Sequence, residues 1–208
     1  IPDSFAIAIR TSAGLVLHSG DLKLDQLPID GVKTDLNRMA ALGDAGIDLL
    51  LIDSTNADVN GFVGHERDIA PVLDNQVRNA KGRVIMTSFA SNIHRIQQAV
   101  DVALANDRKV CFVGRSMIRN VSIARERDYL LVPTGAEVSI DEAASLADNR
   151  LAIVCTGSQG EPLSALARMA EGSHKQISIS DGDMIVFASS LVPGNETAVY
   201  RLVNNLIH

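Results

Sequence analysis

Residues 151–162, Leu-Ala-Ile-Val-Cys-Thr-Gly-Ser-Gln-Gly-Glu-Pro, join an apolar run to a loop of small and polar residues. A short apolar run that ends in turn-forming residues is typical of a strand buried on both faces. The residues that follow have the spacing of a helix. We therefore expect a strand over 151–156, a loop, and a helix over 161–171.

The same order of strand, polar loop and helix recurs along most of the chain. Further strands are expected over 83–88, 109–114 and 184–189, further helices over 66–80, 92–106, 116–128 and 195–207, and a connecting segment with a small helix over 137–147. Strands that alternate with helices indicate right-handed crossovers and a parallel sheet covered on both faces. The predicted fold class is α/β.

The first part of the chain has a different pattern. Two apolar runs, 5–9 and 15–17, flank the turn signal Thr-Ser-Ala-Gly at 11–14 and predict a β-hairpin. A short helix is expected over 36–45, and a second buried strand over 46–52.

Composition sets limits on the protein class. Hydrophobic residues make up 46% of the 208 residues and aromatic residues only 3%, so the core must consist of aliphatic side chains. Cys111 and Cys155 lie in apolar runs and are expected in buried strands, which leaves no disulfide framework and no cysteine-rich zinc site. No apolar run has the length of a membrane span and no signal peptide is evident, so we expect a soluble, cytoplasmic protein.

Charge is unevenly distributed. The net charge is −6, but residues 81–127 contain nine Lys/Arg and three Asp/Glu, a local balance of +6. Such a basic segment is either an electrostatic footprint for nucleic acid or the solvated faces of two helices. The sequence leaves both interpretations open.

Four loops follow the four predicted parallel strands: TSFASN (87–92), VGRSM (113–117), TGSQGEP (156–162) and SSLVPGNE (189–196). They share one edge of the sheet, where helix N-termini favour anions such as phosphate. Capping alone explains any single loop. The candidate phosphate or RNA contacts are Ser88, Ser91, Arg95, Arg115, Arg119, Ser158, Ser189, Ser190 and Asn195. None of the loops matches a dinucleotide fingerprint, a P-loop or a nucleophile elbow.

Two aspartates also follow apolar runs. Asp21 ends the stretch His-Ser-Gly-Asp after residues 15–17, and Asp53 begins Asp-Ser-Thr-Asn after the predicted strand 46–52. Either aspartate alone is more typical of a turn. No histidine belongs to an H-x-H or H-E-x-x-H motif, so the sequence contains no complete metal site.

Several motifs together carry a resemblance to a known family. The chain contains, in this order, IPDSFAIAIRTSAGLVLHSGDLKLD, LLLIDSTNA, MTSFASNIHRIQQ, VGRSM, CTGSQGEPLSALARMA and ASSLVPGNE. This order resembles the bacterial ribonuclease J family, RNA-degrading enzymes of the β-CASP branch of the metallo-β-lactamase superfamily. The resemblance extends through essentially the whole chain.

The resemblance implies a fold and a site. Residues 1–58 would be the rear part of one half of a metallo-β-lactamase αββα core, and 59–208 a Rossmann-like β-CASP domain truncated at its C-terminal end. Asp21 would be a catalytic carboxylate that bridges two divalent ions. Asp53 would be a second catalytic residue, the first β-CASP acidic residue at the edge of the active site, and His18 would be structural. The H-x-H-x-D-H metal motif is expected before Ile1 and further histidines after His208, so the fragment alone should neither bind two metals nor cleave RNA.

The resemblance also implies a function. It predicts a 5′-to-3′ exoribonuclease with endonuclease activity that uses two divalent ions, zinc first and manganese or magnesium as alternatives. The partners would be single-stranded RNA with a 5′-monophosphate and further copies in a dimer or tetramer, with no membrane. Two other classes stay open: a non-catalytic α/β domain that binds a nucleotide or phosphorylated ligand, and an interaction module that supports oligomerisation.

Overall fold

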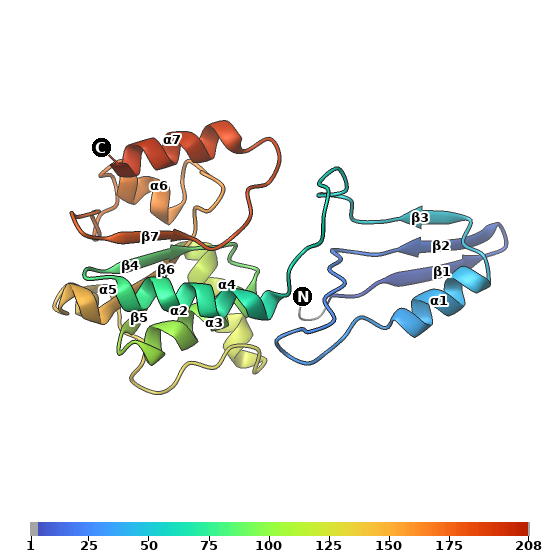
Figure 1. Ribbon diagram of the computed structural model, residues 1–208, viewed down its shortest axis with the longest axis horizontal. Helices are drawn as coiled ribbons and strands as arrows, with labels where there is room; N and C mark the ends of the chain where they lie inside the picture. The colour runs from blue at the N-terminus through green and yellow to red at the C-terminus, as the bar shows by residue number, and fades with distance from the viewer. Residues whose placement is uncertain (1–3, 208) are drawn as a thin grey trace. The chain divides into compact units, whose positions relative to one another are not determined.

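The chain forms two compact units that divide between Ile69 and Ala70 (Figure 1). The computed structural model describes residues 4–207. The domain boundary expected between residues 58 and 59 lies earlier in the chain and stays a prediction. No helix within 4–207 is long and apolar enough to cross a membrane.

A four-stranded parallel sheet forms the centre of the second unit. Its strands are β4 (Val84–Thr87), β5 (Lys109–Val113), β6 (Leu151–Cys155) and β7 (Met184–Phe187), in the order β5-β6-β4-β7. Every neighbouring pair is parallel. The four strands expected from the sequence and the α/β class are therefore confirmed, and the loops after the strands share one edge.

Helices cover both faces of this sheet. Figure 1 shows α2 (Ile69–Asn79), α3 (Ile93–Ala105) and α4 (Arg115–Glu126) on one side, with α6 (Ala165–Ala170) and α7 (Glu196–Ile207) on the other. Shorter helical turns of this unit are α5 (Ile140–Ala143) and η2 (Asp148–Arg150), and a further turn, η1 (Glu66–Asp68), belongs to the first unit. Helix α6 begins later than the expected residue 161, because Ser164 caps it by accepting from the Ala167 N–H.

The strands supply a core to both layers. On one face Cys111, Ile153 and Cys155 pack with Leu166 of α6 and Leu202 of α7. The alternate strand residues point to the opposite face, and they are equally buried: Val84, Met86, Val110, Ala152 and Val154. Burial on both faces is what the continuous apolar runs predicted.

A three-stranded sheet and one helix form the first unit. Strands β1 (Ile7–Thr11) and β2 (Gly14–His18) make the expected antiparallel hairpin, and β3 (Leu49–Leu51) pairs with β2 in parallel. The connection contains α1 (Leu36–Asp44). Leu15 and Leu17 of β2 pack with Leu42 of α1, so one face of the sheet is covered.

The expected buried strand over 46–52 is wrong in its burial and its length. Strand β3 contains only Leu49, Leu50 and Leu51, and these are 49%, 49% and 45% exposed. Ile7 and Ile9 of β1 are also about half exposed, at 55% and 50%. Strand β3 is an edge strand, and within residues 4–207 only one face of this sheet is covered by a helix. An apolar run does not specify what packs against it.

Candidate functional site

Asp21 lies in a tight turn directly after β2. Gly20 before it has φ +61°, and a Cβ on Gly20 would lie 3.0 Å from the carbonyl oxygen of Phe5, so the turn favours glycine. The Asp21 carbonyl accepts from the Ser4 hydroxyl at 3.0 Å. The Asp21 carboxylate is exposed and has no hydrogen-bond partner within residues 4–207. It is therefore an unpaired carboxylate on a constrained backbone.

Asp53 is bonded to the same turn. Its Oδ2 accepts from the N–H of Leu22 at 3.2 Å, and its own N–H donates to the Ser19 hydroxyl at 2.9 Å. Oδ1 accepts from the N–H and the hydroxyl of Thr55. The Thr55 N–H, with the Leu22 N–H and the Thr55 hydroxyl, lowers the pKa of Asp53. The structure thus brings the two aspartate segments together through the bond between Leu22 and Asp53.

These residues do not complete a metal site. Within residues 4–207 no group of three or more His, Cys, Asp or Glu side chains could hold a metal ion. The Nδ1 atom of His18 accepts from the Gly20 N–H at 2.9 Å, which stabilises the turn. A site for two divalent ions would need ligands from outside these residues, and Asp21 can supply one of them.

The loops after β6 and β7 are joined by Gln159, a residue that the sequence did not indicate. Its side-chain Nε2 donates to the Ser190 carbonyl at 2.9 Å and lies 3.5 Å from the Ser189 hydroxyl. Its Oε1 accepts from the Val192 N–H at 2.9 Å and from the Asn195 amide at 3.2 Å. Gln159 is only 5% exposed. It brings the predicted residues Ser189, Ser190 and Asn195 together beside Ser158.

Gly160 fixes how this loop packs. It has φ +71°, and a Cβ there would lie 2.5 Å from the backbone of Ala198 in α7. Any larger residue would displace α7 or the loop. The predicted residue Ser158 is buried, and its hydroxyl has no hydrogen-bond partner within residues 4–207.

The predicted site residues in and after the β4 loop differ in their exposure to solvent. Ser88 is buried and Ser91 is exposed. Arg95 is also buried, and its guanidinium donates to the carbonyl of Ala188, the residue after β7. Its contact with RNA stays a prediction, but the structure gives Arg95 a partner inside the unit. The amide of Asn120 in α4 donates to Ala90 at 2.9 Å and ties this loop to α4.

Arg115 and Arg119 lie in the first turns of α4. Both are exposed, and neither forms an ion pair within residues 4–207. Their spacing of four places them on one face of the helix. Gly114 at the N-terminus has φ +111° and gives no side-chain cap, so the first N–H groups of α4 lack that partner. This end of α4 carries two available cations next to the carboxyl edge of the sheet.

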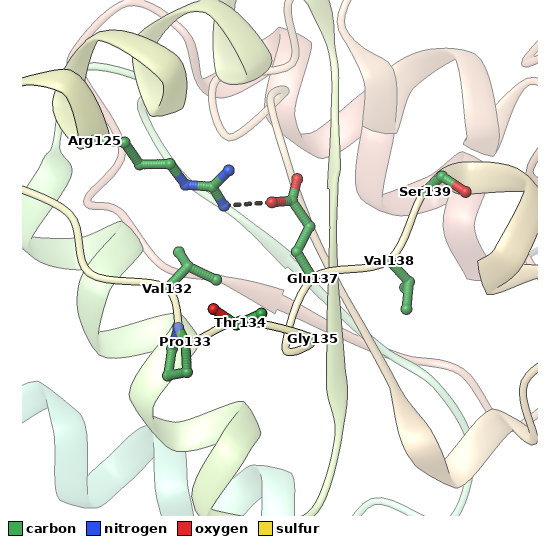
Figure 2. Close-up of a pocket in the computed structure, with 8 residues that line it drawn as sticks. All are labelled: Arg125, Val132, Pro133, Thr134, Gly135, Glu137, Val138 and Ser139. Carbon is green, nitrogen blue, oxygen red and sulfur yellow. Dashed lines mark hydrogen bonds and ion pairs between the residues drawn. The ribbon is translucent and has the colours of Figure 1, made fainter.

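A hollow of about 510 Å³ lies elsewhere on the second unit, between the end of α4 and residues 132–139. Figure 2 shows Arg125 and Glu137 facing each other across it, joined as an ion pair. The Arg125 guanidinium also lies 5.6 Å from the centroid of the Phe112 ring. None of the predicted site residues lines this hollow. Because Glu137 neutralises Arg125, we assign no ligand to it.

Comparison with known proteins identifies the class of the second unit. Residues 81–206 match the model of the ribonuclease J β-CASP domain, in agreement with the parallel sheet and helices seen here. The chain therefore belongs to the ribonuclease J family.

Similarity to curated members of the family extends over nearly the whole chain. The chain is 53% identical to ribonuclease J of Corynebacterium glutamicum over 206 residues, which cover 99% of this chain and 29% of that protein. It is 50% identical to ribonuclease J of Mycolicibacterium smegmatis over 206 residues, 99% of this chain and 37% of that protein. For ribonuclease J of Helicobacter pylori the identity is 45% over 207 residues, 100% of this chain and 30% of that protein. The chain thus spans about a third of the length of these relatives.

Proposed function

We propose that this chain is part of a ribonuclease that hydrolyses RNA phosphodiesters, acting as a 5′-to-3′ exonuclease with endonuclease activity. The observation that carries the proposal is the family membership, supported by the match over residues 81–206 and the identity over nearly the whole chain. The proposed substrate is single-stranded RNA with a 5′-monophosphate. A dimer or tetramer and a cytoplasmic location belong to the same proposal.

Asp21 is the proposed catalytic contribution of the first unit. Its exposed carboxylate would bind divalent metal in the complete protein, with zinc as the first choice and manganese or magnesium as alternatives. Such ions activate water and stabilise a leaving oxygen in phosphodiester hydrolysis. The described residues lack a full ligand set, so we expect no RNA cleavage by the 208-residue chain alone. Asp53 is proposed to hold the turn that carries Asp21.

The first test is Asp21→Ala in the complete protein. We expect RNA turnover and bound metal, measured by elemental analysis of the same sample, to fall together. Asp35→Ala is a matched control, because Asp35 caps α1 in the same unit through the Arg38 N–H. Near-normal turnover in Asp21→Ala would overturn the metal assignment.

The carboxyl edge of the second unit is the proposed RNA-binding surface. Arg115→Glu and Arg119→Glu should weaken RNA binding and make its salt dependence shallower, because each phosphate contact contributes about −0.7 to the log–log slope for single strands. Arg127→Glu is the control, since it changes the same charge just past the opposite end of α4. An equal effect of Arg127→Glu would show that net charge matters and the edge does not.

A further inference from the structure

Four side chains link two segments of the first unit that are about forty residues apart in sequence. Asp25 Oδ1 lies 2.8 Å from His65 Nδ1, and Asp25 Oδ2 accepts from the Glu66 N–H at 2.8 Å. The Lys23 ammonium lies 3.1 Å from the Glu66 carboxylate and 3.9 Å from Asp25. These contacts fix the segment after Asp21 to the start of η1.

Asp25 is the centre of this group. Its side chain is only 8% exposed, and a buried carboxylate is stable only when donors satisfy its oxygens. Besides His65 and Glu66, the N–H of Leu27 donates to Oδ1 at 2.9 Å. The Glu66 N–H, with the Leu27 N–H, His65 and Lys23, holds the pKa of Asp25 well below its usual range, although burial opposes this shift. Asp25 is therefore a charged anchor and not a titrating group near neutral pH.

The backbone is anchored at two points shortly after Asp21. Asp53 holds the N–H of Leu22, the next residue, and Asp25 holds its segment four residues after Asp21. Asp21 has no side-chain partner of its own within residues 4–207. The position of its carboxylate therefore depends on the backbone between these two anchors.

We propose that Asp25, with His65, is a positioning residue that places the Asp21 carboxylate for metal binding and RNA hydrolysis. The inference rests on the proposed function of Asp21. Asp25 does not touch the metal or the RNA in this proposal; it acts only through the backbone of residues 21–25. A free side chain on an unanchored turn would sample many positions, and removal of supporting partners around a metal ligand lowers affinity or activity by roughly 10- to 100-fold.

The experiment uses the complete protein with Asp25→Asn as the main variant. An amide has one acceptor oxygen, so it cannot accept from both the Leu27 and the Glu66 N–H, which bind different oxygens of Asp25. We expect kcat on a 5′-monophosphorylated RNA to fall about tenfold or more, with little change in KM. Binding of Mn²⁺, measured by equilibrium dialysis, should weaken in parallel.

His65 provides a second variant that changes the fold less, since its side chain is 40% exposed. His65→Ala removes the donor to Asp25 and should lower kcat and Mn²⁺ affinity in the same direction. His65→Asn can present an amide N–H near the position of Nδ1 and should restore most of both. Rescue by asparagine would separate positioning from a general loss of stability.

Reference variants separate the failure of this inference from the failure of the proposed function. Asp35→Ala removes a comparable carboxylate bond in the same unit without contact to the Asp21 segment, and it should leave kcat and Mn²⁺ affinity unchanged. If Asp21→Ala abolishes turnover but Asp25→Asn and His65→Ala behave like Asp35→Ala, Asp25 has no positioning role. If Asp21→Ala itself retains turnover, the proposed function fails and the positioning role fails with it.

Discussion

The sheet of the second unit is covered by helices on both faces, whereas the sheet of the first unit has one covered face within residues 4–207. The difference is visible in strands of similar composition. In β6, Ile153 and Val154 are both buried, although they point to opposite faces. In β3, all three leucines are about half exposed. The strands of both units are apolar, so their composition predicts strands in both. Whether the side chains are buried depends on what packs on each sheet.

The two units also hold their candidate residues differently. In the second unit, Gln159 joins two loops that rest on a dense core. In the first unit, the turn that carries Asp21 donates a hydrogen bond from the Leu22 N–H to the Asp53 carboxylate. Within residues 4–207, only Leu15, Leu17 and Leu42 form a buried apolar cluster in this unit. We therefore expect the second unit to be sensitive to changes in apolar volume and the first to changes in polar contacts.

The largest contrast in stability should come from truncating one strand side chain to alanine in each unit. Ile153→Ala in β6 creates a cavity in a covered sheet and should lower the free energy of unfolding by about 4 kcal/mol. Leu49→Ala in β3 removes a half-exposed side chain and should cost about 1 kcal/mol or less. Urea unfolding followed by circular dichroism compares them. Equal losses would break the comparison and would show that β3 is covered in solution.

The next largest loss of stability should come from breaking a buried ion pair in the second unit. Asp183 and Arg83 are paired with side chains that are 2% and 15% exposed, and this bond raises the pKa of Arg83. Asp183→Ala would leave the guanidinium without its anion and should cost about 3 kcal/mol. Glu66→Ala in the first unit removes a partly exposed pair with Lys23 and should cost about 1 kcal/mol or less. The same urea titration measures both, and a larger loss for Glu66→Ala would contradict the ranking.

The sequence predicted most elements because their signals are local. The apolar runs at 84–87 and 151–155 end in small and polar residues, and the strands end there as well. The role of Gln159 was missed because its partners Ser190 and Val192 lie about thirty residues away. The bond between Asp25 and His65 was missed for the same reason. Periodicity locates strands and helices, but it does not report which polar side chains meet in three dimensions.

Acid should lower the stability of the second unit through protonation of His174. Burial, with a contribution from Arg168, lowers the pKa of His174, and its Nδ1 accepts from the Ile177 N–H at 3.2 Å. The unfolded chain then binds the proton more readily, so stability is complete above the unfolded pKa of about 6.5 and falls as the pH drops toward the lower folded pKa. His174→Asn keeps an acceptor that does not titrate. Unfolding at pH 7.5 and 5.5 should show a smaller difference for this variant; an unchanged difference would exclude His174 as the cause.

The smallest effect concerns the ends of two helices, one from each unit. Helix α1 is followed by Gly46 at φ +84°, and α3 is followed by Asp107 at φ +56°. The chain therefore leaves both helices through a residue in the left-handed conformation. An aspartate with a Cβ is strained there and glycine is not, although glycine gains more entropy on unfolding. Asp107→Gly should therefore stabilise by about 0.5 kcal/mol and Gly46→Asp should destabilise by a similar amount. The melting temperatures should shift in opposite directions. A loss of stability in Asp107→Gly would mean that its 4.0 Å contact with Arg150 outweighs the backbone strain.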